Sequence, residues 1–289
     1  MTPKWCLITG GNSGIGKAAA IQLAAAGHKV TIGCRSAERG EHARQEIREL
    51  SDGGSVELAL VDMSSRTSIR RFAELFAREH PRLDVLIHNA AEFDVGRTTP
   101  AYTEEDVESV WATNHLGPVL LTQLLLALLH AGDKGRIITI ASKGLVMYPR
   151  LRVELEDPEF RRARYSVQKA YYQAKLAQVM YTYWLARQLE GTDLTANCIR
   201  VTNVKVDIDR YPDLTKFSKF LYSIKSKSSI TPEKMAEAYV ALATSPEFAG
   251  ISGGYFDENC RPVRSSAYSR EPANIEAMMK LTNRYLALR

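Results

Sequence analysis

The sequence predicts an α/β fold: a doubly wound, parallel, seven-stranded sheet with helices on both faces, formed by residues 1–289 as a single domain. Two observations predict it. Short apolar runs typical of buried strands alternate with helical patterns along the chain. A glycine-rich turn separates the first apolar run from the first helical pattern. The expected strands are Trp5–Thr9, Val30–Cys34, Val56–Val61, Leu83–His88, Arg136–Ala141, Thr195–Val201 and Gly253–Phe256.

Composition and charge are those of an ordinary soluble globular protein. Of 289 residues, 45% are hydrophobic and 25% are charged, and the formal net charge is +5. Such a mild charge does not demand nucleic acid, and we expect no nucleic-acid partner. The four cysteines lack metal-ligand spacing, so we expect no metal site and a reducing compartment. No leader is visible, and the apolar run Leu116–Leu129 is short for a bilayer, which indicates a cytoplasmic protein with no membrane span.

The glycine-rich turn after the first strand is the first candidate ligand site. Glycines let the backbone approach a ligand closely, and the start of the following helix offers free N–H groups and a positive dipole end, which favour a diphosphate. The spacing Gly-x3-Gly-x-Gly is a variant of the dinucleotide fingerprint. A glycine-rich loop without a ligand is the alternative. The candidate cofactor-binding residues here are Gly10, Asn12, Ser13, Gly14, Ile15 and Gly16.

The end of the second strand bears on the choice of cofactor. NAD-preferring folds usually place an acidic residue there to hold the ribose 2′-OH. This chain has Arg35 instead, whose planar guanidinium suits a 2′-phosphate. We therefore expect NADP(H) over NAD(H), the alternative being that Arg35 is a surface charge.

The ends of the third and fourth strands supply further candidates. Asp62, with Met63 beside it, follows the third strand and could accept a hydrogen bond from an adenine amino group or cap the next helix. Asn89, Ala90 and Ala91 follow the fourth strand, and their small size would let a cofactor lie against the backbone.

A long helix is expected to begin at Thr103, with Asp106 completing a capping box. Inside it, Asn114 has apolar neighbours, so its amide needs partners. It either makes a structural hydrogen bond or holds a water. Ser142 follows the fifth strand at its carboxyl end, where ligands bind in open parallel sheets.

Tyr171 and Lys175 are the candidate proton-transfer pair. Residues four apart share one side of a helix, and a nearby ammonium lowers the pKa of a phenol toward values useful for proton exchange with an alcohol or carbonyl. Most pairs with this spacing are solvated neighbours. Tyr165 and Lys169 form a second such pair, which we interpret as a decoy because the apolar periodicity is strongest after Tyr171.

Two segments interrupt the alternation of strands and helices. Residues 143–170 are rich in charge and are expected to form an ordered insertion with some helix. The polar segment 202–230 is expected to close over a substrate as a lid, or else to be a surface excursion. Thr231-Pro232 opens another helix, and a last amphipathic helix is expected from Asn274.

In this order, the glycine turn, Asn89, Asn114, Ser142 and the Tyr171-x3-Lys175 pair resemble the short-chain dehydrogenase/reductase superfamily, which has the Rossmann fold. The runs Ile32–Arg35, Tyr171–Leu189 and Gly254–Phe256, with the long gap before Tyr171, resemble its retinol-dehydrogenase-like branch.

The resemblance implies an NADP(H)-dependent oxidoreductase acting on a carbonyl or secondary alcohol of an apolar small molecule, as a homodimer or homotetramer. Ser142 would orient the carbonyl, Tyr171 would be the acid/base, Lys175 would lower the pKa of Tyr171 and hold the nicotinamide ribose, and Asn114 would anchor a water relay.

One stretch departs from the family pattern. After the sixth strand, Val201–Val206 replaces the usual Pro-Gly-x-Val-x-Thr, in which the Thr helps hold the cofactor, and Val204 is the candidate contact that remains. The departure supports an alternative, a dinucleotide-binding sensor without turnover. A carbon–carbon double-bond reductase on the same fold is a third possibility.

Overall fold

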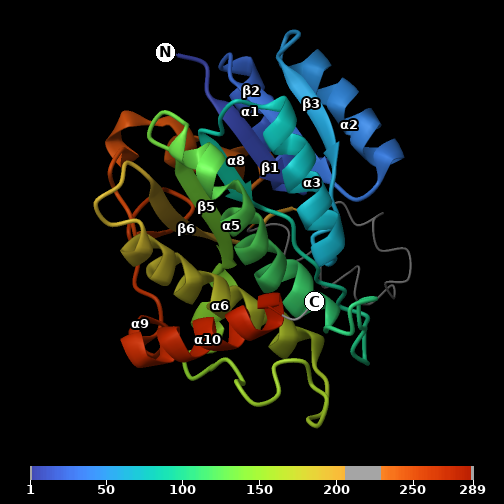
Figure 1. The fold of residues 1–289 in the computed structure, drawn as a ribbon, viewed down its shortest axis with the longest axis vertical. Helices are drawn as coiled ribbons and strands as arrows, with labels where there is room; N and C mark the ends of the chain where they lie inside the picture. The colour runs from blue at the N-terminus through green and yellow to red at the C-terminus, as the bar shows by residue number, and fades with distance from the viewer. Residues whose placement is uncertain (1, 206–228, 288–289) are drawn as a thin grey trace.

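The computed structural model describes residues 2–205 and 229–287 (Figure 1). Its centre is a seven-stranded sheet in which every neighbouring pair is parallel, in the order β3-β2-β1-β4-β5-β6-β7. The predicted fold class is therefore confirmed. The strands are β1 Trp5–Thr9, β2 Lys29–Cys34, β3 Val56–Leu60, β4 Val85–His88, β5 Arg136–Ser142, β6 Thr195–Val201 and β7 Tyr255–Phe256.

Helices cover both faces of the sheet because successive strand residues point to opposite sides. Cys6 and Ile8 of β1 pack with α1, α2 and α8, whereas Leu7 packs with α3, α5 and α6 on the other face (Figure 1). The helices are α1 Gly14–Ala25, α2 Ala37–Leu50, α3 Arg66–Glu79, α4 Ser109–Trp111, α5 Gly117–His130, α6 Val167–Gln188, α8 Pro232–Thr244, α9 Ala267–Arg270 and α10 Pro272–Ala287. Short π- or 3-10-helical turns are η1 Ala112–Leu116, η2 Lys143–Met147 and η4 Pro246–Phe248.

The helix predicted to begin at Thr103 begins six residues later, at Ser109. Asp106 takes a left-handed backbone conformation, with φ of 56°, and its N–H bonds to the carbonyl of Thr103, which closes a turn instead of opening a helix. Glu108 is the capping residue, because its Oε2 accepts from the N–H of Trp111 at 2.8 Å. The capping-box prediction is wrong because a local turn satisfies the same backbone groups.

Elements α4, η1 and α5 join into one apolar helix over Ser109–His130. Its 22 residues are long and apolar enough, by length and composition, to cross a membrane, and 67% of its most apolar window is buried in the fold. The helix is longer than the run Leu116–Leu129, which the sequence alone indicated as too short for a bilayer. Its burial against α3 and the sheet fits the core helix that we expected.

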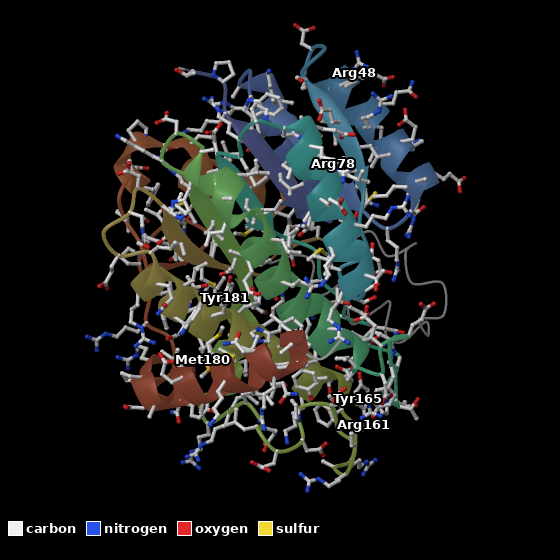
Figure 2. All side chains as sticks on the ribbon, viewed as in Figure 1. Arg48, Arg78, Arg161, Tyr165, Met180 and Tyr181 are labelled. Atoms are coloured by element: carbon white, nitrogen blue, oxygen red, sulfur yellow. The ribbon has the colours of Figure 1, made fainter. Side chains whose placement is uncertain are left out.

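The insertion before α6 determines which tyrosine–lysine pair lies on a helix. Ser166 caps α6 by accepting from the N–H of Lys169, so Tyr165 precedes the helix, whereas Tyr171 and Lys175 both lie within it. Tyr165 instead points toward Glu108, 3.4 Å from its Oε1. Figure 2 shows Tyr165 and Arg161 in this insertion, at the end of the molecule away from Arg48 and Arg78. Most of the predicted lid, 202–230, lies outside the described residues.

Candidate functional site

The glycine turn leads into α1, and no side chain caps the first backbone N–H groups of that helix. Gly10 and Gly14 have φ of 66° and 55°, which glycine adopts without strain. Ser13 is the N-cap of α1, yet its side chain accepts no hydrogen bond. The N-caps of α2, α3, α6 and α8 all do. The first turn of α1 therefore offers free donors and a positive dipole end, which suits a diphosphate.

Asn89 braces this turn from the end of β4. Its Nδ2 donates to the carbonyl oxygens of Thr9 and Gly10 at 3.0 and 3.1 Å. A Cβ on Gly16 would lie 2.4 Å from that Nδ2, and a Cβ on Gly10 would lie 2.9 Å from Cα of Ala90. Glycine is thus required at both positions for the turn and the end of β4 to meet.

A cleft of about 850 Å³ opens beside this junction. It runs from the carboxyl end of β2 to the loop after β4, and most of the predicted cofactor-binding residues line it. Of those residues, the cleft is lined by Gly10, Asn12, Ser13, Gly14, Ile15, Arg35, Asp62, Met63, Asn89, Ala90 and Ala91. A long, glycine-floored cleft with a guanidinium at one end fits a dinucleotide.

Among the described residues, four of the predicted contacts do not line this cleft: Gly16, Tyr171, Lys175 and Val204. Gly16 lies behind it against Asn89. Val204 forms an isolated parallel bridge with Ile230, so the altered loop after β6 is paired at this point.

Asp62 does not cap α3, so that alternative is excluded. Its Oδ1 accepts from both the N–H and the hydroxyl of Ser64, at 2.9 and 2.7 Å. Ser65 caps the helix by accepting from the N–H of Ser68 at 3.2 Å. The carboxylate remains at the wall of the cleft.

Lys175 is almost fully buried, with 2% of its surface exposed. Its Nζ donates to the carbonyl oxygen of Ile140 on β5 at 2.9 Å and lies 5.7 Å from the centre of the Tyr171 ring. Burial lowers the pKa of Lys175 to about 8, because removal from water disfavours the charged form. The lysine thus titrates close to neutral pH, beside the tyrosine with which it was paired in the sequence.

Tyr171 is one of a series of aromatic contacts. Its ring stacks on Phe93 with centroids 4.3 Å apart, and it meets Tyr172 edge to face at 5.3 Å. The Tyr172 ring packs against Tyr148 at 4.7 Å. We call Phe93, Tyr171, Tyr172 and Tyr148 the aromatic row. Because Phe93 lines the cleft, the row connects Tyr171 to it.

Ser142 ends β5 and reaches the aromatic row through Gly144. The Oγ of Ser142 accepts from the N–H of Gly144 at 3.2 Å. A Cβ on Gly144 would lie 2.3 Å from the Tyr172 hydroxyl, so the turn after Ser142 packs directly on that ring. The fold therefore gathers Ser142, Tyr171 and Lys175 around the β5–α6 junction.

Asn114 is buried in the π-helical turn η1, and both ends of its side-chain amide bond to Glu92. Its Oδ1 accepts from the Glu92 N–H at 2.7 Å, and its Nδ2 donates to the Glu92 carbonyl oxygen at 2.9 Å. The structural hydrogen bond expected as one alternative is therefore present, and it fixes the loop after β4.

Sequence reasoning missed the next residues of this loop, Glu92, Phe93 and Arg97, which line the cleft. Arg97 pairs with the Glu92 carboxylate and donates to the Ser109 hydroxyl at 2.8 Å. Their position directly after Asn89-Ala90-Ala91, at the carboxyl end of a central strand, was the signal that could have identified them.

Comparison with known proteins agrees with this geometry. Residues 4–152 match the family model for short chain dehydrogenases. Mouse retinol dehydrogenase 14 is 36% identical over 269 residues, covering 89% of this chain and 78% of that protein. A crystal structure of an uncharacterized protein from Mycobacterium paratuberculosis has a TM-score of 0.73 and 27% identity, covering 98% of this chain and 92% of its own. A blue fluorescent protein from a metagenomic library, in complex with NADPH, has a TM-score of 0.67 and 25% identity, covering 88% and 95%.

These relatives correct one expectation. Retinol dehydrogenase 14 and human retinol dehydrogenases 13 and 12, at 34% and 32% identity, are membrane-associated enzymes, which contradicts the predicted cytoplasmic location. The prediction rested on the cysteine pattern, on the lack of a visible leader and on the length of the run Leu116–Leu129.

The glycine-floored cleft, the half-buried Tyr171 beside the buried Lys175 and these matches have one explanation: the chain belongs to the short-chain dehydrogenase family of nicotinamide-dependent oxidoreductases, in its retinol-dehydrogenase-like branch.

Proposed function

We propose that this protein is an NADP(H)-dependent oxidoreductase that interconverts a carbonyl and an alcohol on an apolar small molecule, with Tyr171 as the acid/base. The observation that carries the proposal is the buried Lys175, which lies 5.7 Å from the Tyr171 ring and has a pKa lowered to about 8. A lysine is rarely buried without a task, and a perturbed pKa beside a cleft is typical of a functional site.

The cleft residues would hold the cofactor along its length. The uncapped start of α1 would bind the diphosphate, Arg35 the 2′-phosphate, and Asp62 with Met63 the adenine end. Asn89, Ala90 and Ala91 would lie against the cofactor's middle. Val204, within the altered loop, would contact the nicotinamide end of the cofactor. The NADPH-bound relative supports NADP(H), as does the guanidinium at the end of β2.

The bound nicotinamide would supply or accept the hydride. Ser142 would donate a hydrogen bond to the substrate oxygen, and Tyr171 would give that oxygen its proton during reduction and take it back during oxidation. The ammonium of Lys175 would stabilise the phenolate left behind and contact the nicotinamide ribose. Asn114 would anchor a water behind the lysine, as well as clamping Glu92.

The test is to mix the protein with NADPH and a panel of apolar aldehydes and ketones while following NADPH fluorescence. Oxidation of NADPH in the presence of at least one carbonyl, giving the matching alcohol, is the expected result. Binding of NADPH without oxidation across the panel would contradict the proposal.

That outcome would instead support a dinucleotide-binding sensor, the candidate favoured by the departure at Val201–Val206. Product analysis separates carbonyl reduction from reduction of a carbon–carbon double bond, the third candidate. The proposal includes two further points. The chain is a single domain with a substrate lid at about residues 202–230, and it assembles as a homodimer or homotetramer.

A further inference from the structure

Phe93 covers one face of the Tyr171 ring. Its ring stacks on that of Tyr171 with centroids 4.3 Å apart and planes inclined by 28°. Carbon atoms in contact lie about 3.5–4.0 Å apart, so no substrate layer fits between the two rings. Tyr172 flanks the same phenol edge to face at 5.3 Å. A ligand that reaches Tyr171 from the cleft would therefore meet the Phe93 ring, which lines it.

The loop around Phe93 is held in place by Glu92. Asn114 bonds to both backbone groups of Glu92 at 2.7 and 2.9 Å. The Glu92 carboxylate pairs with Arg97 and accepts from the Ser109 hydroxyl at 2.8 Å. Because the backbone and the side chain of Glu92 are both held by hydrogen bonds, the position of Phe93 next to it is fixed.

The opposite end of the aromatic row is equally constrained. Tyr172 is packed against Gly144, where an added Cβ would lie 2.3 Å from its hydroxyl, and against Tyr148 at 4.7 Å. Tyr172 therefore cannot move aside toward η2 to make room near Tyr171. Tyr171 is therefore bounded by rings on two sides, by Phe93 and by Tyr172.

Resting on the proposed function, we propose that Phe93 is a specificity-determining residue that admits carbonyl compounds with one small flank, aldehydes and methyl ketones, and excludes those with two bulky flanks. A hydrogen atom or a methyl group passes the ring edge, whereas a second aryl group would have to displace the stacked ring.

Three compounds test this: benzaldehyde, acetophenone and benzophenone, which share a phenyl group and differ in the second flank. With NADPH, wild-type kcat/KM should fall in that order. In Phe93→Ala the benzophenone-to-benzaldehyde ratio should rise about tenfold or more. Phe93→Leu, which keeps bulk but loses the flat stack, should raise it less. Leu50→Ala, at an exposed position at the end of α2, is the matched control and should leave the ratio unchanged.

Binding of the same three compounds to the NADPH-loaded protein, measured by calorimetry, separates this inference from the proposed function. If Phe93→Ala leaves the benzophenone-to-benzaldehyde ratio unchanged, both in kcat/KM and in binding affinity, the proposed role of Phe93 is wrong. A selective gain of benzophenone binding in Phe93→Ala, without turnover of any compound by any variant, supports that role and overturns the oxidoreductase.

Discussion

The ammonium of Lys175 donates a hydrogen bond to the carbonyl oxygen of Ile140 across 2.9 Å and so joins helix α6 to strand β5 inside the fold. The contact compensates only part of the cost of burying a charge, and the pKa of Lys175 falls to about 8. The ammonium is therefore present below about pH 8 and is lost above it.

This titration predicts the alkaline limb of the activity profile. As pH rises through about 8, kcat/KM should fall by up to about tenfold per unit, because the cation that stabilises the phenolate of Tyr171 disappears. Lys175→Arg keeps its charge at alkaline pH. Whatever its absolute rate, the pH dependence of its kcat/KM should therefore lack the alkaline limb. Lys169→Met removes the lysine of the decoy pair, which is partly exposed and forms an ion pair with Glu154; it is the control and should retain the limb. A wild-type profile without a limb near pH 8 would count against the pairing.

Removal of the Tyr171 hydroxyl should separate binding from chemistry. In Tyr171→Phe, kcat for carbonyl reduction should fall by about 10²-fold or more, since the proton donor is gone. The dissociation constant for NADPH should change by less than about threefold, as the ring and its stack on Phe93 remain. Steady-state kinetics and fluorescence titration measure the two quantities.

Tyr172→Phe is the matched control for that experiment. It removes the neighbouring hydroxyl from the same row of rings, and its kcat should stay within about threefold of wild type. Comparable losses in both variants would mean that packing, and not proton transfer, explains the result.

Arg35 should determine the preference for NADPH. In Arg35→Ser the dissociation constant for NADPH should rise about tenfold or more, because a charged hydrogen bond to a phosphate contributes about 1.5–3 kcal/mol. Affinity for NADH, which lacks the 2′-phosphate, should change little. Arg48→Ser, in the last turn of α2 (Figure 2), controls for loss of surface charge. An equal loss of affinity for NADPH and for NADH would contradict the assignment of Arg35 to the 2′-phosphate.

Glu108 predicts a pH-dependent stability. Burial raises the pKa of its carboxyl group to about 7 from 4.5. Between these values the folded state holds a proton that the unfolded state releases, so the contribution of Glu108 is present below pH 4.5 and is lost as pH rises through 7. The free energy of unfolding of Glu108→Gln, relative to wild type, should therefore increase from pH 5 to pH 8. Urea unfolding at each pH measures it, and Glu104→Gln, at an exposed position, should show no such trend.

The fold was predictable because its signals are local and periodic. Strands β1 and β6 have their predicted bounds, since apolar runs flanked by turns leave little choice of conformation. The start of the central helix was wrong because Thr103-x-x-Asp106 fits a capping box and a tight turn equally well, and only contacts distant in sequence, such as that of Glu108 with Glu159, favour the turn.

The residues of the candidate site that belong to local sequence motifs could be predicted. The glycine turn, Arg35, Asp62 and the residues directly after β4 were all named from the sequence, and they line one cleft. Phe93 was missed because its stacking on Tyr171 joins residues 78 positions apart and leaves no periodic signature. The depth at which Lys175 is buried was equally invisible, since spacing says which residues face each other and not what covers them.

The sheet order places the two ends of the cleft in regions of different expected rigidity. Arg35 and Asp62 follow β2 and β3, the outer strands on one side, whereas Asn89, at the other end of the cleft, follows the central strand β4. Outer strands unfold locally more readily than central ones. A ligand that binds only the folded state lowers the population of these locally unfolded states. Occupation of the cleft should thus slow amide hydrogen exchange most at this margin of the sheet, far from the proposed reaction centre at Tyr171.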